Sequence, residues 1–263
     1  MTVGFSGDVA EYYAKFRRGY PPQVLETLQT AFALTTDDIV LDLGCGTGQL
    51  AIPLASRVRS VIGMDPEPDM LRLARKSAMR QGIQNATWVL GADTDVPALG
   101  ELLEQRSLAM AVIGQALHWM HHEELFRVLS PLLRSGGGIA VVSNGTPLWL
   151  QNSDWSRSLR VCLEHYFGTK LEASCGTGAP DRLRYAQALE AAGFEDVREI
   201  VIEYSDELSC DQLIGGVYSA IPADELPGPE DRPTFTERIR QSLPSDQRFT
   251  ENVRVCALVG RSR

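Results

Sequence analysis

Residues 40–48 read Val-Leu-Asp-Leu-Gly-Cys-Gly-Thr-Gly, a short apolar run that stops at a cluster of alternating glycines. Such a run is typical of a strand buried on both faces of a parallel sheet. Glycine permits positive φ and close approach of a ligand to the backbone. A helix that begins directly after the loop would present unpaired N–H groups. The stretch therefore predicts a strand, a ligand-binding loop and a helix start in succession.

Strand and helix patterns alternate outward from this loop. Because this alternation is typical of doubly wound sheets, we predict an α/β fold with a mostly parallel, seven-stranded, Rossmann-like sheet. A helix from about Glu123 to Leu133 is expected before the fifth strand, ending at Gly136–Gly138. The strands are expected at residues 39–43, 60–64, 87–90, 110–113, 138–142, 197–204 and 253–260.

The pattern changes after Ser143, where aromatic residues and a Pro-rich stretch interrupt the alternation. We interpret residues 1–263 as one domain with insertions. Its expected parts are an N-terminal helical arm (1–35), a cofactor-binding core (36–145), and lid or substrate segments (146–180 and 205–250).

The overall charge argues against a nucleic-acid partner. The chain has 34 acidic and 25 basic residues, a net charge of −9, whereas binding to a phosphate backbone needs a basic surface.

No run approaches the roughly 18 apolar residues of a membrane span. The five cysteines form no C-x-x-C motif, so we expect a reduced, cytoplasmic protein. Lysine occurs only at Lys15, Lys76 and Lys170, a bias that suggests a GC-rich bacterial genome.

An acidic residue, Asp65, follows the glycine loop at a sequence spacing that is informative about the ligand. In the dinucleotide motif G-x-G-x-x-G, Gly44 and Gly46 fit, but the third position is Gln49 and the third glycine falls at Gly48. Asp65 ends the expected second strand, 21 residues after Gly44. A carboxylate there can accept both ribose hydroxyls of an adenosine. The spacing indicates an adenosine-containing cofactor other than a typical dinucleotide.

Residues 42–48 and 61–66, Asp-Leu-Gly-Cys-Gly-Thr-Gly and Val-Ile-Gly-Met-Asp-Pro, closely resemble the class I S-adenosylmethionine-dependent methyltransferases. The resemblance continues through Gln-Ala-Leu-His-Trp at 115–119 and through residues 128–137. Residues 10–21 look like the arm of the small-molecule branch, methyltransferase type 11, which includes trans-aconitate methyltransferase-like proteins. The similarity covers about residues 5–145.

This resemblance implies S-adenosylmethionine as cofactor and S-adenosylhomocysteine as product. The backbone of residues 44–46 would face the methionine part, Asp65 would hold the ribose, and Pro66 and Met70 would pack on the adenine or only on the helix start. The adenine amino group would meet Asp93 or the backbone of residues 92–94. The residues expected at the cofactor are Tyr13, Arg17, Gly44, Cys45, Gly46, Asp65, Pro66, Met70, Ala92, Asp93 and Gln115.

Tyr13 and Arg17 lie one helical turn apart in the expected arm, on the same face of the helix. Arg17 could hold the carboxylate of the cofactor in a charge-assisted bond, or it could be an ordinary solvated cation. The family commonly has proline after this arginine, whereas this chain has Arg18.

The methyl acceptor is expected near His118, just past the fourth strand. Methyl transfer from a sulfonium needs positioning above all, and a hydroxyl acceptor also benefits from a base. His118 is a candidate base, a group that orients the acceptor, or a structural residue. Trp119 and Trp149 are expected as acceptor contacts, and the aromatic segment after Ser143 suggests an apolar or aromatic acceptor with a polar handle. No metal site is expected from these histidines.

The sequence thus predicts methyl transfer from S-adenosylmethionine to a small organic molecule. We expect O-methylation of a hydroxyl or carboxyl, in bacterial specialised metabolism, with N- and C-methylation as alternatives. A second interpretation is a cofactor-binding protein with a cyclase or regulatory role. A nicotinamide-dependent oxidoreductase is disfavoured by Gln49 and by residues 115–119, and RNA methylation is disfavoured by the net charge.

Overall fold

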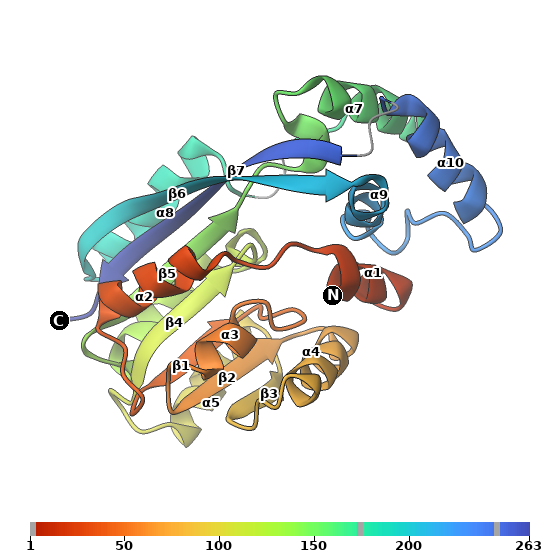
Figure 1. Cartoon of the computed structure of the whole chain (residues 1–263). Helices are drawn as coiled ribbons and strands as arrows, with labels where there is room; N and C mark the ends of the chain where they lie inside the picture. Colours follow the sequence, from red (N-terminus) through yellow and green to blue (C-terminus); the bar gives the residue numbers. More distant parts are fainter. Residues whose placement is uncertain (1–3, 173–175, 245–247) are drawn as a thin grey trace. The chain divides into compact units, whose positions relative to one another are not determined.

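The computed structural model describes residues 4–172, 176–244 and 248–263. They form a seven-stranded sheet in the order β3-β2-β1-β4-β5-β7-β6 (Figure 1). The pairs β1–β2, β1–β4, β2–β3 and β4–β5 are parallel, whereas β5 and β7 are antiparallel. The prediction of a mostly parallel Rossmann-like sheet is therefore confirmed. The strands are β1 (Ile39–Leu43), β2 (Ser60–Asp65), β3 (Ala86–Leu90), β4 (Leu108–Gly114), β5 (Leu133–Asn144), β6 (Glu195–Ser209) and β7 (Arg248–Arg261).

The described residues divide into two compact units. The first unit comprises residues 4–18, 145–172, 203–244 and 248–254, and the second comprises 19–144, 176–202 and 255–263. The expected division into arm, core and lid segments stays a prediction. Residues 1–3, 173–175 and 245–247, which fall within the expected arm and lid segments, lie outside the described residues.

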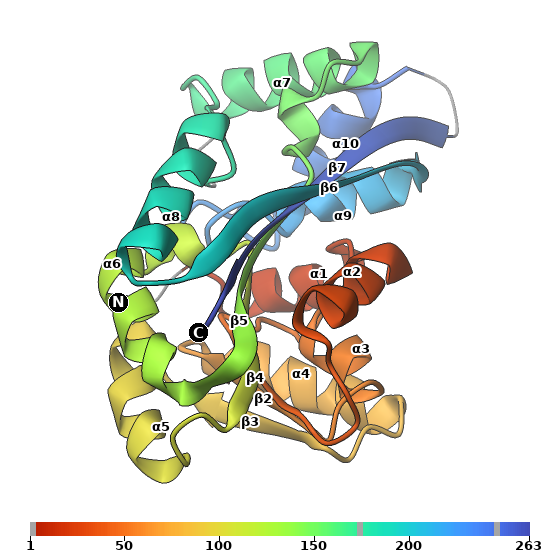
Figure 2. The same cartoon turned by 90° about the vertical axis from the view of Figure 1, so that its left-hand side faces the viewer.

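In the second unit, helices cover both faces of the sheet. Figure 2 shows α2, α3 and α4 on one face and α5, α6 and α8 on the other. The main apolar core includes Leu43, Ile113, Phe126 and Leu133, each almost fully buried. Burial of one such side chain contributes on the order of 1.5–3 kcal/mol. The helices are α2 (Pro22–Phe32), α3 (Ala51–Ala55), α4 (Pro68–Arg80), α5 (Val96–Leu102), α6 (His122–Leu129) and α8 (Ala179–Ala191).

The junction between α6 and β5 differs from the expectation. The helix predicted to reach Leu133 ends at Leu129 and continues as a short 3-10 turn, η3 (Ser130–Leu132). Pro131 explains this end, because proline lacks the N–H that a continuing helix needs and clashes with the preceding turn. The glycines at 136–138 lie within β5 and do not end the helix. A Cβ at Gly138 would lie 2.1 Å from the carbonyl oxygen of Gly260, so glycine is required where β5 meets β7.

The first unit is built from helices around its own apolar cluster. This cluster includes Leu159, Leu213 and Phe235. The rings of Tyr12 and Tyr218 stack at 4.7 Å and join the first helix to the cluster. The helices are α1 (Asp8–Phe16), η4 (Leu148–Leu150), α7 (Asp154–Phe167), α9 (Cys210–Tyr218) and α10 (Arg232–Ser242). No helix in the described part of the chain is both long and apolar enough to cross a membrane.

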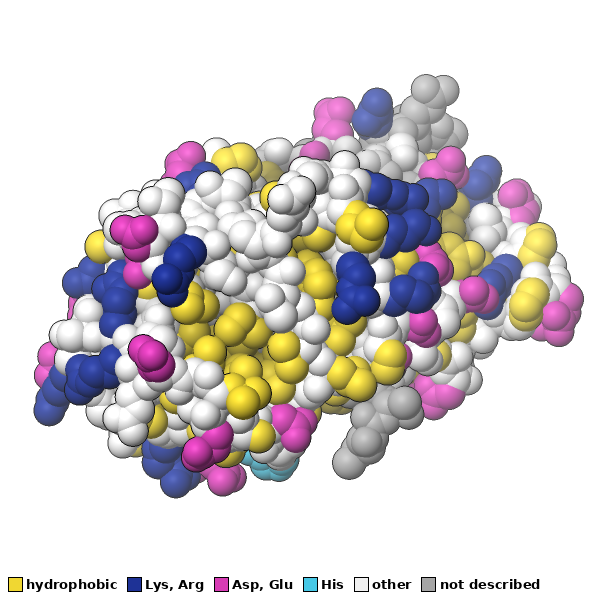
Figure 3. All heavy atoms as spheres, turned by 90° about the horizontal axis from the view of Figure 1, so that it is seen from below, with side chains coloured by type: hydrophobic (Ala, Val, Ile, Leu, Met, Phe, Trp, Pro, Cys, Tyr) yellow, Lys and Arg dark blue, Asp and Glu magenta, His cyan; other side chains and the backbone are white. Residues whose placement is uncertain are grey.

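Hydrophobic side chains also reach the surface of the second unit. Figure 3 views the molecule from below Figure 1, where β3 and α5 lie, and shows such side chains gathered there. Met79, Leu90 and Leu102, on α4, β3 and α5, are each more than half exposed. Because β3 is an edge strand, Leu90 has no neighbouring strand beyond it in the sheet among the described residues.

Candidate functional site

The glycine loop, residues 44–48, joins β1 to the turn before α3. The N–H groups of Gly44 and Cys45 donate to the carbonyl of Met64, at 2.8 and 3.0 Å. The N–H of Gly46 donates to Oδ2 of Asp65 at 2.8 Å. These three N–H groups therefore fix the loop to the end of β2 and are not free for a ligand. What the loop offers a ligand is a closely approachable backbone. The unpaired N–H groups expected from the sequence belong to the start of the following helix and stay a prediction.

Asp65 stands at the end of β2 with both carboxylate oxygens engaged. Oδ2 accepts from Gly46 and Oδ1 accepts from the N–H of Glu67 at 2.9 Å. Burial raises the pKa of Asp65, and these two backbone N–H groups oppose the rise. Each oxygen keeps a second lone pair. The two bonds fix the orientation of the side chain, and its contact with a ribose stays a prediction.

Asp42 is a second buried carboxyl that the sequence interpretation did not single out. It lies on β1 and is 1 % exposed. Its Oδ2 is buried and has no hydrogen-bond partner among the described residues. Burial, reinforced by the charge of Asp65 and opposed by a bond from the N–H of Ala51, raises the pKa of Asp42 to about 7. Its sequence signal was a charged residue inside an otherwise apolar strand.

Two neighbouring buried carboxyls suit a ligand that carries positive charge, because each lacks a cation of its own. S-adenosylmethionine carries a sulfonium and an ammonium group. The unpartnered Oδ2 of Asp42 is therefore an observation of this chain that fits that cofactor. A nicotinamide dinucleotide would instead bring pyrophosphate anions toward the same two acids.

The segment after β3 holds the predicted adenine contacts. Asp93 begins a 3-10 turn, η1 (Asp93–Asp95), and its Oδ2 accepts from the N–H of His121 at 2.8 Å. The N–H of Ala92 donates to Asp95 at 2.9 Å. Both groups therefore already have protein partners. Their contact with adenine stays a prediction. The contacts predicted for Met70, which is buried on α4, and for Pro66, which is exposed beside Asp65, also stay predictions.

Gln115 directly follows β4 and has a backbone φ of 55°, in the left-handed region. Holding a non-glycine residue there costs about 1–2 kcal/mol. Its side-chain Nε2 donates to the carbonyl of Asn144 at 3.1 Å, which ties β4 to β5. Its Oε1 is buried and unpartnered among the described residues, so it can accept a hydrogen bond from a ligand.

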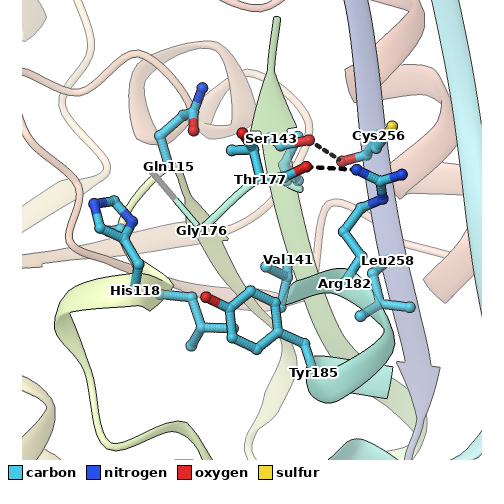
Figure 4. Close-up of a pocket in the computed structure, with 13 residues that line it drawn as sticks. Gln115, His118, Val141, Ser143, Gly176, Thr177, Arg182, Tyr185, Cys256 and Leu258 are labelled. Carbon is cyan, nitrogen blue, oxygen red and sulfur yellow. Dashed lines mark hydrogen bonds between the residues drawn. The ribbon is translucent and has the colours of Figure 1, made fainter. Parts of the chain in front are cut away.

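A pocket opens beside Gln115 (Figure 4). Its walls come from residues 115–118, from β5, from β7 and from the segment 176–185. His118 lies in a 3-10 turn, η2 (Leu117–Trp119), and lines this pocket. Burial lowers the pKa of His118, and the charge of Asp181 opposes this effect.

The structure brings only some of the predicted acceptor and cofactor residues to this pocket. Trp119 is 59 % exposed and is not among the residues that line it, although its ring lies 4.9 Å from that of His118. Tyr13, Arg17 and Trp149 belong to the first unit. Their predicted roles stay predictions. Among the described residues, no group of three His, Cys, Asp or Glu side chains is placed to hold a metal ion.

Comparison with known proteins agrees with this geometry. Residues 40–137 match the family model described as a methyltransferase domain. An uncharacterized methyltransferase of Mycobacterium tuberculosis is 31% identical over 144 residues, which cover 55% of this chain and 53% of that protein. A probable S-adenosylmethionine-dependent methyltransferase of Saccharomyces cerevisiae is 30% identical over 132 residues, 49% of this chain and 43% of that protein. The chain thus spans about half the length of these curated relatives.

A solved structure of a putative type II methyltransferase from Anaeromyxobacter dehalogenans has the same fold. Its TM-score is 0.61 at 17% identity, and the alignment covers 94% of this chain and 98% of that one. The fold, the glycine loop with Asp65, and the family match of residues 40–137 agree with one another and are those of a Rossmann-like methyltransferase domain.

Proposed function

We propose that this protein transfers the methyl group of S-adenosylmethionine to a small organic acceptor, preferably to a hydroxyl or carboxyl oxygen, in bacterial specialised metabolism. One observation carries the proposal: the glycine loop and the pocket share a wall. A Cβ at Gly44 would lie 2.5 Å from the Cβ of Ala116, which itself lines the pocket. A donor in the loop and an acceptor in the pocket would therefore be neighbours.

S-adenosylmethionine supplies an activated methyl group when bound. The residues of this chain bind the cofactor, orient the acceptor and exclude water. Asp65 accepts hydrogen bonds from the ribose, and Asp42 and Gln115 offer unpartnered oxygens to positively charged or donor groups. The pocket would hold the acceptor beside the cofactor, and His118 would take up the proton of an acceptor hydroxyl.

Titration calorimetry with S-adenosylmethionine, S-adenosylhomocysteine and NADH tests the cofactor assignment first. We expect the two sulfur compounds to bind at about micromolar Kd and NADH not to bind. Methyl transfer to a panel of small acceptors, with radiolabelled S-adenosylmethionine, then tests the activity. Binding of NADH, or cofactor binding without transfer to any acceptor, would contradict the proposal and favour the oxidoreductase or the regulatory alternative.

Changing Asp65 to Ala is expected to weaken binding of S-adenosylmethionine by about 1–3 kcal/mol. The change removes the acceptor of the ribose hydroxyls and leaves the N–H groups of Gly46 and Glu67 without their partner. Calorimetry measures the affinity. Asp69→Ala is the matched control, because Asp69 lies one turn further along and pairs with Arg72 at the surface. Equal affinities for wild type and Asp65→Ala would show that Asp65 does not contribute to cofactor binding.

Changing His118 to Gln is expected to lower kcat about 10²-fold or more at saturating acceptor, because glutamine keeps a hydrogen bond but cannot take the proton. The lowered pKa of His118 predicts that the wild-type rate is constant above pH 7 and falls in acid, as the imidazole becomes protonated. His121→Gln is the control, since His121 is largely exposed. A change in KM alone would assign His118 to orientation of the acceptor.

A further inference from the structure

The positive charge that lines the pocket has a negatively charged partner, and this pairing affects which acceptor can bind. Arg182, on α8, is the only lysine or arginine among the described residues that line the pocket. Its Nε lies 2.8 Å from Oε1 of Glu199 on β6. Its Nη1 donates to the carbonyl of Thr177 at 2.5 Å, as Figure 4 shows. The positive charge of Arg182 is therefore already balanced by Glu199.

Two other ionisable side chains of the pocket, His118 and Tyr185, are uncharged near neutral pH. Burial lowers the pKa of His118 and raises the pKa of Tyr185, which is 3 % exposed. Around Tyr185, the charge of Asp181 adds to the rise, whereas Arg184 opposes it. The Ser143 hydroxyl is a neutral group and donates to the carbonyl of Cys256 at 3.4 Å.

His118 and Tyr185 lie close to one another, and both lie against Gly176. A Cβ at Gly176 would lie 2.6 Å from the Cβ of His118 and 2.6 Å from the hydroxyl oxygen of Tyr185. Gly176 has a φ of 59°, so both the backbone and the lack of space require glycine. Figure 4 shows the Tyr185 hydroxyl pointing toward the His118 side of the pocket. Beside Gly176, an acceptor would meet the imidazole of His118 and the hydroxyl of Tyr185, both neutral.

A carboxylate that leaves water for this pocket would find no unbalanced cation, and burial of an unpaired charge is strongly unfavourable. An alcohol or phenol can donate its proton to His118 and hydrogen-bond to Tyr185 without such a penalty. The apolar side chains among the lining residues also suit a neutral molecule better than an anion.

We propose that the acceptor is a neutral hydroxyl compound, an alcohol or phenol, and that Glu199 determines this specificity by neutralising Arg182. The inference rests on the proposed function and narrows its substrate class. In the reaction the acceptor oxygen forms a bond to the methyl carbon as the carbon–sulfur bond breaks. That electron pair stays on sulfur, and the hydroxyl proton goes to the imidazole of His118.

Matched pairs of compounds test this specificity: phenol with benzoate, and 1-hexanol with hexanoate. Product is measured by mass spectrometry with S-adenosylmethionine as donor. We expect the wild-type kcat/KM for the hydroxyl member to exceed that for the carboxylate by at least about 100-fold. Glu199→Gln removes the balancing charge at nearly constant size, so we expect that ratio to fall at least about tenfold.

Glu195→Gln is the matched control. Glu195 lies on the same strand, but its partner is Arg263, which, unlike Arg182, is not among the described residues that line the pocket. It should leave the ratio unchanged. Comparable wild-type rates on both members of a pair would overturn the inference, and so would an unchanged ratio in Glu199→Gln.

Binding gives a second readout that does not need turnover. The same compounds are titrated into protein saturated with S-adenosylhomocysteine and followed by saturation-transfer NMR. Signals from the alcohols alone support the inference, whereas carboxylate signals, or no signal from either class, overturn it. Failure of the proposed function appears separately, as alcohols that bind but are never methylated.

Discussion

Replacing Asp42 by Asn is expected to stabilise the ligand-free protein above pH 7 and to change its stability little near pH 4. In the unfolded chain Asp42 loses its proton near the ordinary pKa of 3.8, whereas in the folded protein it keeps the proton to about pH 7. Between these values the folded state binds more protons than the unfolded state. Stability therefore falls as pH rises through this range and levels off above it.

The cause is the burial of Asp42 between elements that supply no cation. Asp65 adds negative charge from β2, Cys45 lies close enough to feel the charge of Asp42, and only the N–H of Ala51 opposes the effect. Asparagine has nearly the same shape and never ionises. The gain from the substitution should grow by about 1.4 kcal/mol per pH unit between pH 4 and 7, to a maximum of about 4 kcal/mol.

Urea unfolding of wild type and Asp42→Asn at pH 4, 5, 6, 7 and 8 measures this gain. Asp37→Asn is the control, because Asp37 is exposed in the turn before β1 and its replacement should change stability by a similar small amount at every pH. A pH-independent difference between wild type and Asp42→Asn would show that Asp42 ionises normally in the folded protein.

The features that local sequence pattern predicted well are those that local chemistry determines. The run at 40–43 is apolar because β1 is covered on both faces, and Asp65 is found at the end of β2 because a parallel strand stops where its apolar run stops. Gln49 in the third glycine position already separated the loop from a dinucleotide site. These signals needed no knowledge of distant contacts.

The features that were missed depend on residues far apart in the chain. Asp93 accepts from the N–H of His121, 28 residues away. Tyr185 and Arg182 reach the pocket from α8, and Glu199 reaches Arg182 from β6. No spacing rule relates such positions, because loop lengths and helix packing decide which side chains meet. Asp42 was visible as a charge in an apolar strand, but the lack of a partner for its Oδ2 became apparent only in three dimensions.

Replacing Gly44 by Ala is expected to abolish binding of S-adenosylmethionine within the range of calorimetry, a loss of at least about 100-fold, and to lower stability. Gly44 has a φ of 69°, which costs an L-residue about 1–2 kcal/mol. The added Cβ would also lie 2.5 Å from the Cβ of Ala116, a short side chain that cannot turn aside. Because this contact joins the glycine loop to the pocket wall, the loop must move away from both. Overpacking of this kind costs about 1–3 kcal/mol more.

Gly82→Ala separates these two causes. Gly82 follows α4 with a φ of 71°, nearly that of Gly44, but a Cβ added at Gly82 would meet nothing within 4 Å. It should therefore show the conformational cost alone and bind cofactor normally. The double variant Gly44→Ala with Ala116→Gly should recover part of the affinity, because it removes the clash and leaves only the end of the Met120 side chain at 3.1 Å. If Gly44→Ala behaves like Gly82→Ala in unfolding and in calorimetry, the shared wall between loop and pocket does not position the cofactor, and the two sites act independently.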